Sequence, residues 1–227
     1  MRIPLTILAL VGMVLLALYR FAPPPGPDAL TPRTDLPWQI TVQPDGGSRV
    51  FDLDLGRATL GDAMAKFGTP EGLAVFEPKS GGLSLEAYFG TVQLGPLTAK
   101  VVVGLAADAA ELERLRATAT GREGSPSGDW KYPLGGSTHE HMQRRITVIS
   151  YVPGTRGLDA DFFRARFGEP VATLRETEQA VSWFYPDRGV SILIDDDGRE
   201  VLEYVAPRDF VLPEAATPHS ATDHVQN

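Results

Sequence analysis

The chain contains no cysteine among its 227 residues. This absence excludes a disulfide, a thiolate metal site, a thiol nucleophile and a lipid-modified N-terminal cysteine. Basic residues are also few, because 21 Lys and Arg stand against 29 Asp and Glu and give a net charge of −8. Nucleic acids and anionic membrane surfaces are recognised by clustered Lys and Arg. We therefore expect neither of them to be the main partner, and we exclude nucleic acid.

The sequence also lacks the common catalytic motifs: the Walker loop, Gly-x-Ser-x-Gly and His-Glu-x-x-His. One weak metal pattern is present, since His139 and His141 flank Glu140 and residues i and i+2 of a strand share a face. No third ligand is marked by spacing, so a solvated face is the favoured interpretation. Residues 195–198, Asp-Asp-Asp-Gly, do not have the alternate spacing of a calcium loop and instead predict a hairpin turn. We predict no metal, no cofactor and no enzymatic activity.

Residues 3–19 form a long run without charge that is mostly apolar. At about 1.5 Å per residue this run is roughly 25 Å long, and Phe21 and Ala22 bring it closer to a hydrocarbon core of about 30 Å. A cleaved secretory signal is the alternative, but Arg20-Phe21-Ala22 is a poor cleavage site. We predict that residues 1–22 are an uncleaved transmembrane signal-anchor. The protein would then be single-pass in the inner (cytoplasmic) membrane, with its domain on the extracytoplasmic, periplasmic side.

The composition divides the rest of the chain into three parts. Residues 23–37 contain six prolines and predict a semi-rigid, extended linker. Residues 38–212 have the mixed composition of a folded domain. Residues 213–227 are small and polar and predict a disordered tail.

Two short stretches one hundred residues apart, Phe-Gly-Thr-Pro and Phe-Gly-Glu-Pro, follow the same pattern. A glycine just past a helix end can adopt the left-handed conformation, with positive φ, without cost, and a proline two residues later cannot continue the helix. Each helix also has a capping candidate at its start, Thr59 or Asp159. The residues that carry the repeat are Phe67, Gly68 and Pro70 in the first copy and Phe167, Gly168 and Pro170 in the second.

Strand candidates surround both helices. Phe51 and Tyr151 lie in strand-like runs before them, again one hundred residues apart. Alternating apolar residues after them predict strands at 73–76, 83–89 and 100–105, and at 181–185, 190–194 and 201–205. Residues 146–152 predict the strand that enters the second copy, residues 107–118 a helix, and residues 120–136, rich in Gly, Ser and Pro, a loop.

These elements favour one unit used twice, over residues 51–105 and 151–205. Chance similarity between two helix ends is the alternative. The predicted fold class is α+β, with an N-terminal transmembrane helix followed by two similar helix-plus-antiparallel-sheet repeats. We expect the two repeats to share one sheet, because residues 107–136 offer no clean linker between them.

Three aromatic residues, Trp183, Phe184 and Tyr185, are adjacent in a predicted strand. Alternate residues of a strand face opposite sides of the sheet, so at least one ring should belong to the core. Another is a candidate for contact with a partner if it is exposed. Burial of all three is the alternative.

The second copy resembles small envelope lipoproteins of the SmpA/OmlA type, which are BamE-like. The resemblance rests on Phe167-Gly168-x-Pro170, the run Trp183-Phe184-Tyr185, an apolar strand, an Asp-Gly turn and a final strand. It implies a helix followed by a three-stranded antiparallel sheet, binding to other envelope proteins and no catalytic residues. The missing lipid-attachment cysteine and the doubled unit depart from that family.

The sequence thus leads to the hypothesis of a membrane-anchored, extracytoplasmic interaction or scaffold module. One alternative is a hydrolase or metal-dependent enzyme whose residues meet only in the fold, with His139 and His141 as first candidates. Another is a carrier of small ligands or lipids, which would require an apolar cavity between the two halves.

Overall fold

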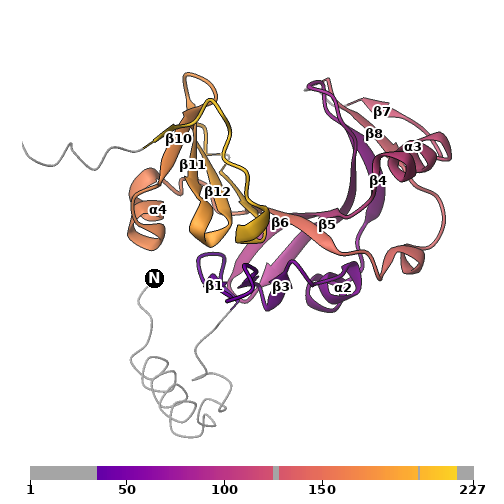
Figure 1. Cartoon of the computed structure of the whole chain (residues 1–227), viewed down its shortest axis with the longest axis horizontal. Coiled ribbons are helices and arrows are strands. Elements are labelled where there is room, and N and C mark those ends of the chain that lie inside the picture. Colours follow the sequence, from indigo (N-terminus) through magenta and orange to yellow (C-terminus); the bar gives the residue numbers. More distant parts are fainter. Residues whose placement is uncertain (1–34, 125–127, 199, 219–227) are drawn as a thin grey trace, which may run out of the picture. The chain divides into compact units, whose positions relative to one another are not determined.

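The computed structural model describes residues 35–124, 128–198 and 200–218 (Figure 1). Within these ranges there are three α-helices: α2 (Leu60–Phe67), α3 (Ala109–Ala117) and α4 (Ala160–Phe167). The remaining regular structure is almost entirely antiparallel strand. The described domain is therefore mainly β, and the predicted α+β fold class is wrong.

One sheet of eleven strands dominates the described residues. Its strands, in spatial order, are β14 (Thr217–Pro218), β10 (Ala172–Arg175), β11 (Ala180–Tyr185), β12 (Val190–Asp195), β13 (Val201–Tyr204), β9 (Ile146–Pro153), β6 (Leu97–Leu105), β5 (Ser84–Leu94), β4 (Gly72–Glu77), β8 (Trp130–Pro133) and β7 (Glu123–Gly124). A small second sheet contains β1 (Thr41–Val42), β2 (Ser48–Val50) and β3 (Leu53–Leu55). Every strand pair in both sheets is antiparallel.

The order of the large sheet is symmetric about its middle. Helix α2 precedes β4, β5 and β6 and, after the insertion of α3, β7 and β8, strand β9. Helix α4 precedes β10, β11, β12 and β13, and β9 and β13 meet at the centre. Across that centre Ile149 pairs with Tyr204, and Tyr151 pairs with Leu202. The strand expected to enter a second copy, β9, thus lies between β6 and β13, and four strands of each half correspond, while β7, β8 and β14 extend the two edges of the sheet.

The two helix ends have matching geometry. Thr59 and Asp159 cap the starts of α2 and α4, each side chain accepting a hydrogen bond from a backbone N–H three residues on. Gly68 has φ of 91° and Gly168 has φ of 78°, which confirms the predicted positive φ. Both have ψ of −166°, in an extended region that only glycine readily enters rather than the left-handed helical region. Phe167 is buried, while Phe67 is partly buried and packs against the core.

The placement of Phe51 in a strand is wrong. Phe51 and Asp52 form the two-residue turn between β2 and β3, with φ of 54° and 63°. The Phe51 side chain is fully buried, and its ring centroid lies 5.5 Å from that of Tyr151 and 5.2 Å from that of Tyr204. An aromatic residue disfavours positive φ, so packing of this ring against the core determines the turn.

The predicted signal-anchor over residues 1–22, and the linker as far as residue 34, lie outside the described residues. Among residues 35–124, 128–198 and 200–218, no helix is long and apolar enough to cross a membrane. The described residues therefore give no support to the predicted transmembrane helix, to the membrane attachment through it or to the single-pass inner-membrane location, and we do not retain these three predictions.

The end of the predicted linker packs against the domain. The Lys66 ammonium bonds the carboxylate of the buried Asp35 at 2.9 Å, and the Pro37 carbonyl accepts a hydrogen bond from the Tyr204 hydroxyl at 2.9 Å. The predicted tail also needs correction in part, because residues 217–218 form β14 and pair with β10. Residues 219–227 lie outside the described chain.

Of the other local predictions, that of the hairpin is confirmed and that of the loop is wrong. The hairpin at residues 195–198 is confirmed, since β12 pairs with β13 and the Gly198 N–H donates to the Asp195 carbonyl at 2.8 Å. The loop predicted at 120–136 instead contains β7 and β8, and β8 pairs with β4. Pairing with an existing strand supplies the backbone bonds that local sequence does not indicate.

We expect Tyr204→Phe to destabilise the protein by about 1–3 kcal/mol, since it leaves the Pro37 carbonyl without its donor. Tyr204 is only 1% exposed, so water cannot readily replace the lost hydroxyl. The control is Tyr151→Phe, because the Tyr151 hydroxyl makes no hydrogen bond within the described residues. Its effect should stay within about 0.5 kcal/mol. Urea unfolding measures both, and equal losses would contradict this assignment of hydrogen bonds.

Candidate functional site

The two faces of the large sheet differ in chemistry. Helices α2, α3 and α4 pack on one face, where the apolar side chains of the strands form the core (Figure 1). Trp183, Ile192 and Leu202 point to this face from β11, β12 and β13, and all three are buried. Their strand neighbours Ser182, Ser191 and Glu203 point to the opposite face because strand residues alternate. We call this opposite side the open face.

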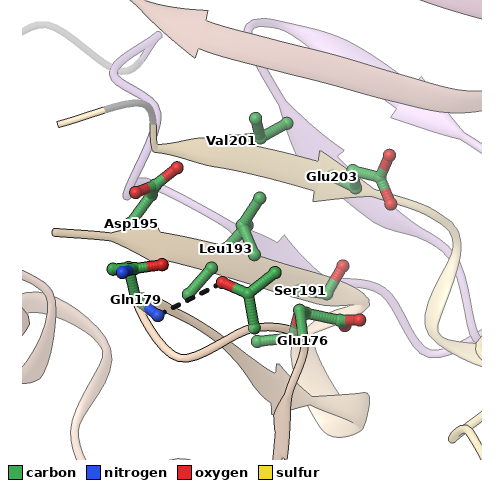
Figure 2. Close-up of a pocket in the computed structure, with 10 residues that line it drawn as sticks. Glu176, Gln179, Ser191, Leu193, Asp195, Val201 and Glu203 are labelled. Atoms are coloured by element: carbon green, nitrogen blue, oxygen red, sulfur yellow. Dashed lines mark hydrogen bonds between the residues drawn. The ribbon is translucent and has the colours of Figure 1, made fainter. Parts of the chain in front are cut away.

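An open hollow of about 690 Å³ lies on the open face over β11, β12 and β13. Figure 2 shows polar side chains around it, with Leu193 and Val201 between them. We call it the acidic hollow. Its lining residues are Glu176, Thr177, Gln179, Ala180, Ser182, Ser191, Leu193, Asp195, Val201 and Glu203.

The acidic hollow combines carboxylates with hydroxyl and amide groups. Glu176, Asp195 and Glu203 supply the carboxylates, and none of the ten lining residues is basic. The Ser182 hydroxyl donates to the Glu176 carboxylate at 2.7 Å. This bond ties the loop after β10 to β11 and fixes one wall. The arrangement favours a ligand that donates hydrogen bonds and carries positive charge.

Glu203 is the carboxylate nearest the centre of the sheet, where β13 meets β9. Its pKa is raised above the ordinary value, first because surrounding protein atoms displace water from the carboxylate. A hydrogen bond from the Ser150 hydroxyl, at 3.4 Å, opposes that rise, and the negative charge of Glu86 adds to it. The side chain nevertheless remains exposed to solvent. A cation beside Glu203 would therefore relieve an unfavourable charge.

A second hollow, of about 370 Å³, lies on the open face in the other half of the sheet. Its lining includes Glu71, Glu86 and Lys131, so its charges are mixed. The Glu71 N–H donates to the Tyr88 carbonyl at 2.7 Å, and the Val171 N–H donates to the Phe184 carbonyl at 2.9 Å, which shows that the halves are built alike here. The acidic hollow differs because every charged residue in its described lining is acidic.

The structure places the two candidate metal ligands in a short 3-10 helix, η2 (Thr138–His141). The His141 Nδ1 accepts a hydrogen bond from the Arg144 Nε at 2.9 Å, and the Arg144 guanidinium also pairs with Glu111. Burial, and then the Arg144 charge, lower the pKa of His141. No group of three or more His, Asp or Glu in the described part of the chain is placed to hold a metal.

The aromatic run of β11 is buried throughout. Trp183 is 8% exposed and lies under the Arg164 guanidinium, and the Tyr185 hydroxyl donates to the Gly168 carbonyl at 3.0 Å. Phe184 faces the open side, but Phe210 from the C-terminal segment covers it, with 6.5 Å between ring centroids. None of these rings is available as an exposed contact for a partner.

Sequence reasoning missed the acidic hollow. Its signal was present, because Ser182, Ser191 and Glu203 each alternate with buried apolar residues. What the sequence did not show is that the three strands are adjacent and that the face they share carries no helix in the described chain.

Comparisons with protein-family models, with curated proteins and with solved structures find no match for this chain.

Proposed function

We propose that the protein is a non-catalytic binding module whose acidic hollow receives a Lys or Arg side chain of a protein partner. The observation that carries this proposal is the set of three carboxylates around a partly apolar floor, with no basic residue among the described residues that line it. Carboxylates bind ammonium and guanidinium groups through charge-assisted hydrogen bonds. Leu193 and Val201 offer apolar surface for the methylene groups of the same side chain.

The chemistry of the hollow supports binding rather than catalysis. The lining residues offer hydroxyl, amide and carboxylate groups, but no imidazole, thiol or amine. Imidazole is the group that most often activates a nucleophile near neutral pH. Among the described histidines, His141 bonds Arg144 in a different part of the chain.

The charge of the whole protein supports the same partner class. A net charge of −8 attracts basic proteins over a distance and raises their association rate at low salt. Binding should therefore weaken as salt rises. Protonation of Glu203 would remove one attractive charge, so affinity should also fall as the pH drops through the raised pKa of this carboxyl.

The test uses the full chain and a labelled nonapeptide in which three lysines alternate with leucines, read by fluorescence anisotropy. A matched peptide with glutamate in place of each lysine should not bind. We expect the double variant Asp195→Asn, Glu203→Gln to weaken binding of the lysine peptide by about three- to tenfold, as for partly exposed ion pairs.

The matched control is Glu113→Gln, Asp161→Asn, which changes the net charge by the same amount on helices α3 and α4. It should retain nearly all of the affinity. Equal losses in the two double variants would show only long-range attraction. Either that result or equal binding of the two peptides would overturn the proposal.

A further inference from the structure

The helix-bearing face contains a separate hollow of about 200 Å³. It lies between the two halves of the sheet, since β6 and β9 line it from one half and α4 and β13 from the other. Leu97, Leu158 and Phe163 contribute apolar walls, and Trp38 and Phe162 meet edge to face with 5.7 Å between centroids. We call it the aromatic hollow.

The Arg166 guanidinium supports the aromatic wall. It lies 3.4 Å from the Phe162 ring centroid and 4.7 Å from that of Trp38, and its Nη1 donates to the Phe162 carbonyl at 3.1 Å. Cation–π contacts of this kind hold the two rings in place. The wall is thus formed before any ligand arrives, which lowers the cost of binding.

One of the residues around this hollow is a buried tyrosine. Tyr151 lines it and is only 3% exposed, yet its hydroxyl makes no hydrogen bond with the described residues. Every fully enclosed side-chain nitrogen or oxygen in that part of the chain has a hydrogen-bond partner. The Tyr151 oxygen is therefore not fully enclosed, and because Tyr151 lines the hollow we infer that a molecule there reaches it.

In the other half of the sheet, the hydroxyl of the corresponding tyrosine already has a hydrogen-bond partner. Tyr151 and Tyr204 hold equivalent positions in the symmetric pairing of β9 with β13. The Tyr204 hydroxyl donates to the Pro37 carbonyl at 2.9 Å, so its hydrogen bond is made within the protein. Burial raises the pKa of Tyr151 to about 12, so at neutral pH its hydroxyl keeps the proton and acts as a donor.

We propose that the aromatic hollow binds a small monocyclic aromatic compound carrying one carbonyl oxygen, which accepts a hydrogen bond from Tyr151. The size fits, because an apolar cavity of about 150 Å³ accommodates benzene. The ring would pack against Trp38, Phe162 and Phe163. The carbonyl would supply the partner that the Tyr151 hydroxyl lacks in the protein.

The experiment compares acetophenone with α-methylstyrene, which has nearly the same shape but no acceptor. Both are titrated into the full chain and followed by NMR chemical shifts. We expect acetophenone to bind about fivefold more tightly, the value of one net hydrogen bond. Tyr151→Phe should abolish this difference and leave the fold intact. Tyr88→Phe, on the open face, should preserve it.

A second variant tests the location. Leu158→Trp should fill the hollow and reduce the binding of both probes at least fivefold, with near-UV circular dichroism showing whether it folds; Leu97→Trp replaces it if it does not. The variant Asp195→Asn, Glu203→Gln should bind acetophenone normally, which separates this site from the acidic hollow. Absence of saturable acetophenone binding, equal affinity for the two probes, or unchanged discrimination in Tyr151→Phe would overturn the proposal.

Discussion

Replacing Phe51 with alanine is expected to lower the free energy of unfolding by about 3–5 kcal/mol, as for other fully buried aromatic residues. The Phe51 ring is fully buried and contacts Phe67, Tyr151 and Tyr204. It therefore joins the β2–β3 turn to α2 and to both central strands. Its loss would leave a cavity in the centre of the core.

The measurement is urea unfolding of the full chain, with the slope against urea used to check that the denatured state is unchanged. Phe76→Ala is the control, because Phe76 is half-buried on the open face and packs against fewer core residues. It should lower stability less. A loss below about 1 kcal/mol for Phe51→Ala would contradict the packing of this turn.

The second large effect is expected at the helix ends. Gly168→Val should destabilise the protein by about 1–3 kcal/mol, and Gly168→Ala by less, since β-branched residues tolerate positive φ worst. The same order should hold at Gly68. A Cβ at either glycine would meet no atom within 4 Å, so the loss caused by alanine would come from backbone strain.

Gly72→Ala gives a clean control. Gly72 also has open space around a built Cβ, but it lies in β4 and does not have positive φ. Alanine there should leave stability unchanged or raise it slightly, by reducing the freedom of the unfolded chain. Thermal unfolding would measure all of these variants. Equal effects of alanine at Gly72 and Gly168 would contradict the strained cap.

Local sequence signals predicted the helices well. Capping residues, apolar spacing and a glycine that requires positive φ predicted where α2 and α4 begin and end. These signals act over a few residues, so no knowledge of the fold is needed. The Asp-Gly hairpin between β12 and β13 was predicted for the same reason.

Long-range pairing accounts for most of what the sequence did not reveal. Phe51 adopts positive φ only because a core of distant aromatic rings receives it. Strand β8 forms in a Gly- and Ser-rich segment because β4 offers an edge. The acidic hollow requires that β11, β12 and β13 be neighbours, and the aromatic hollow requires β6, β9 and α4 to meet. None of these contacts leaves a local pattern.

The central claim, that the acidic hollow binds a basic partner, is tested most directly by mapping where the lysine peptide binds. Amide chemical shifts of the full chain, recorded during titration, would locate the contact without any mutation. We predict that the largest changes occur on β11, β12 and β13, at Ser182, Ser191, Leu193 and Glu203. Changes centred on the helix-bearing face or on the edge strands β7 and β14, or no saturable change, would contradict it.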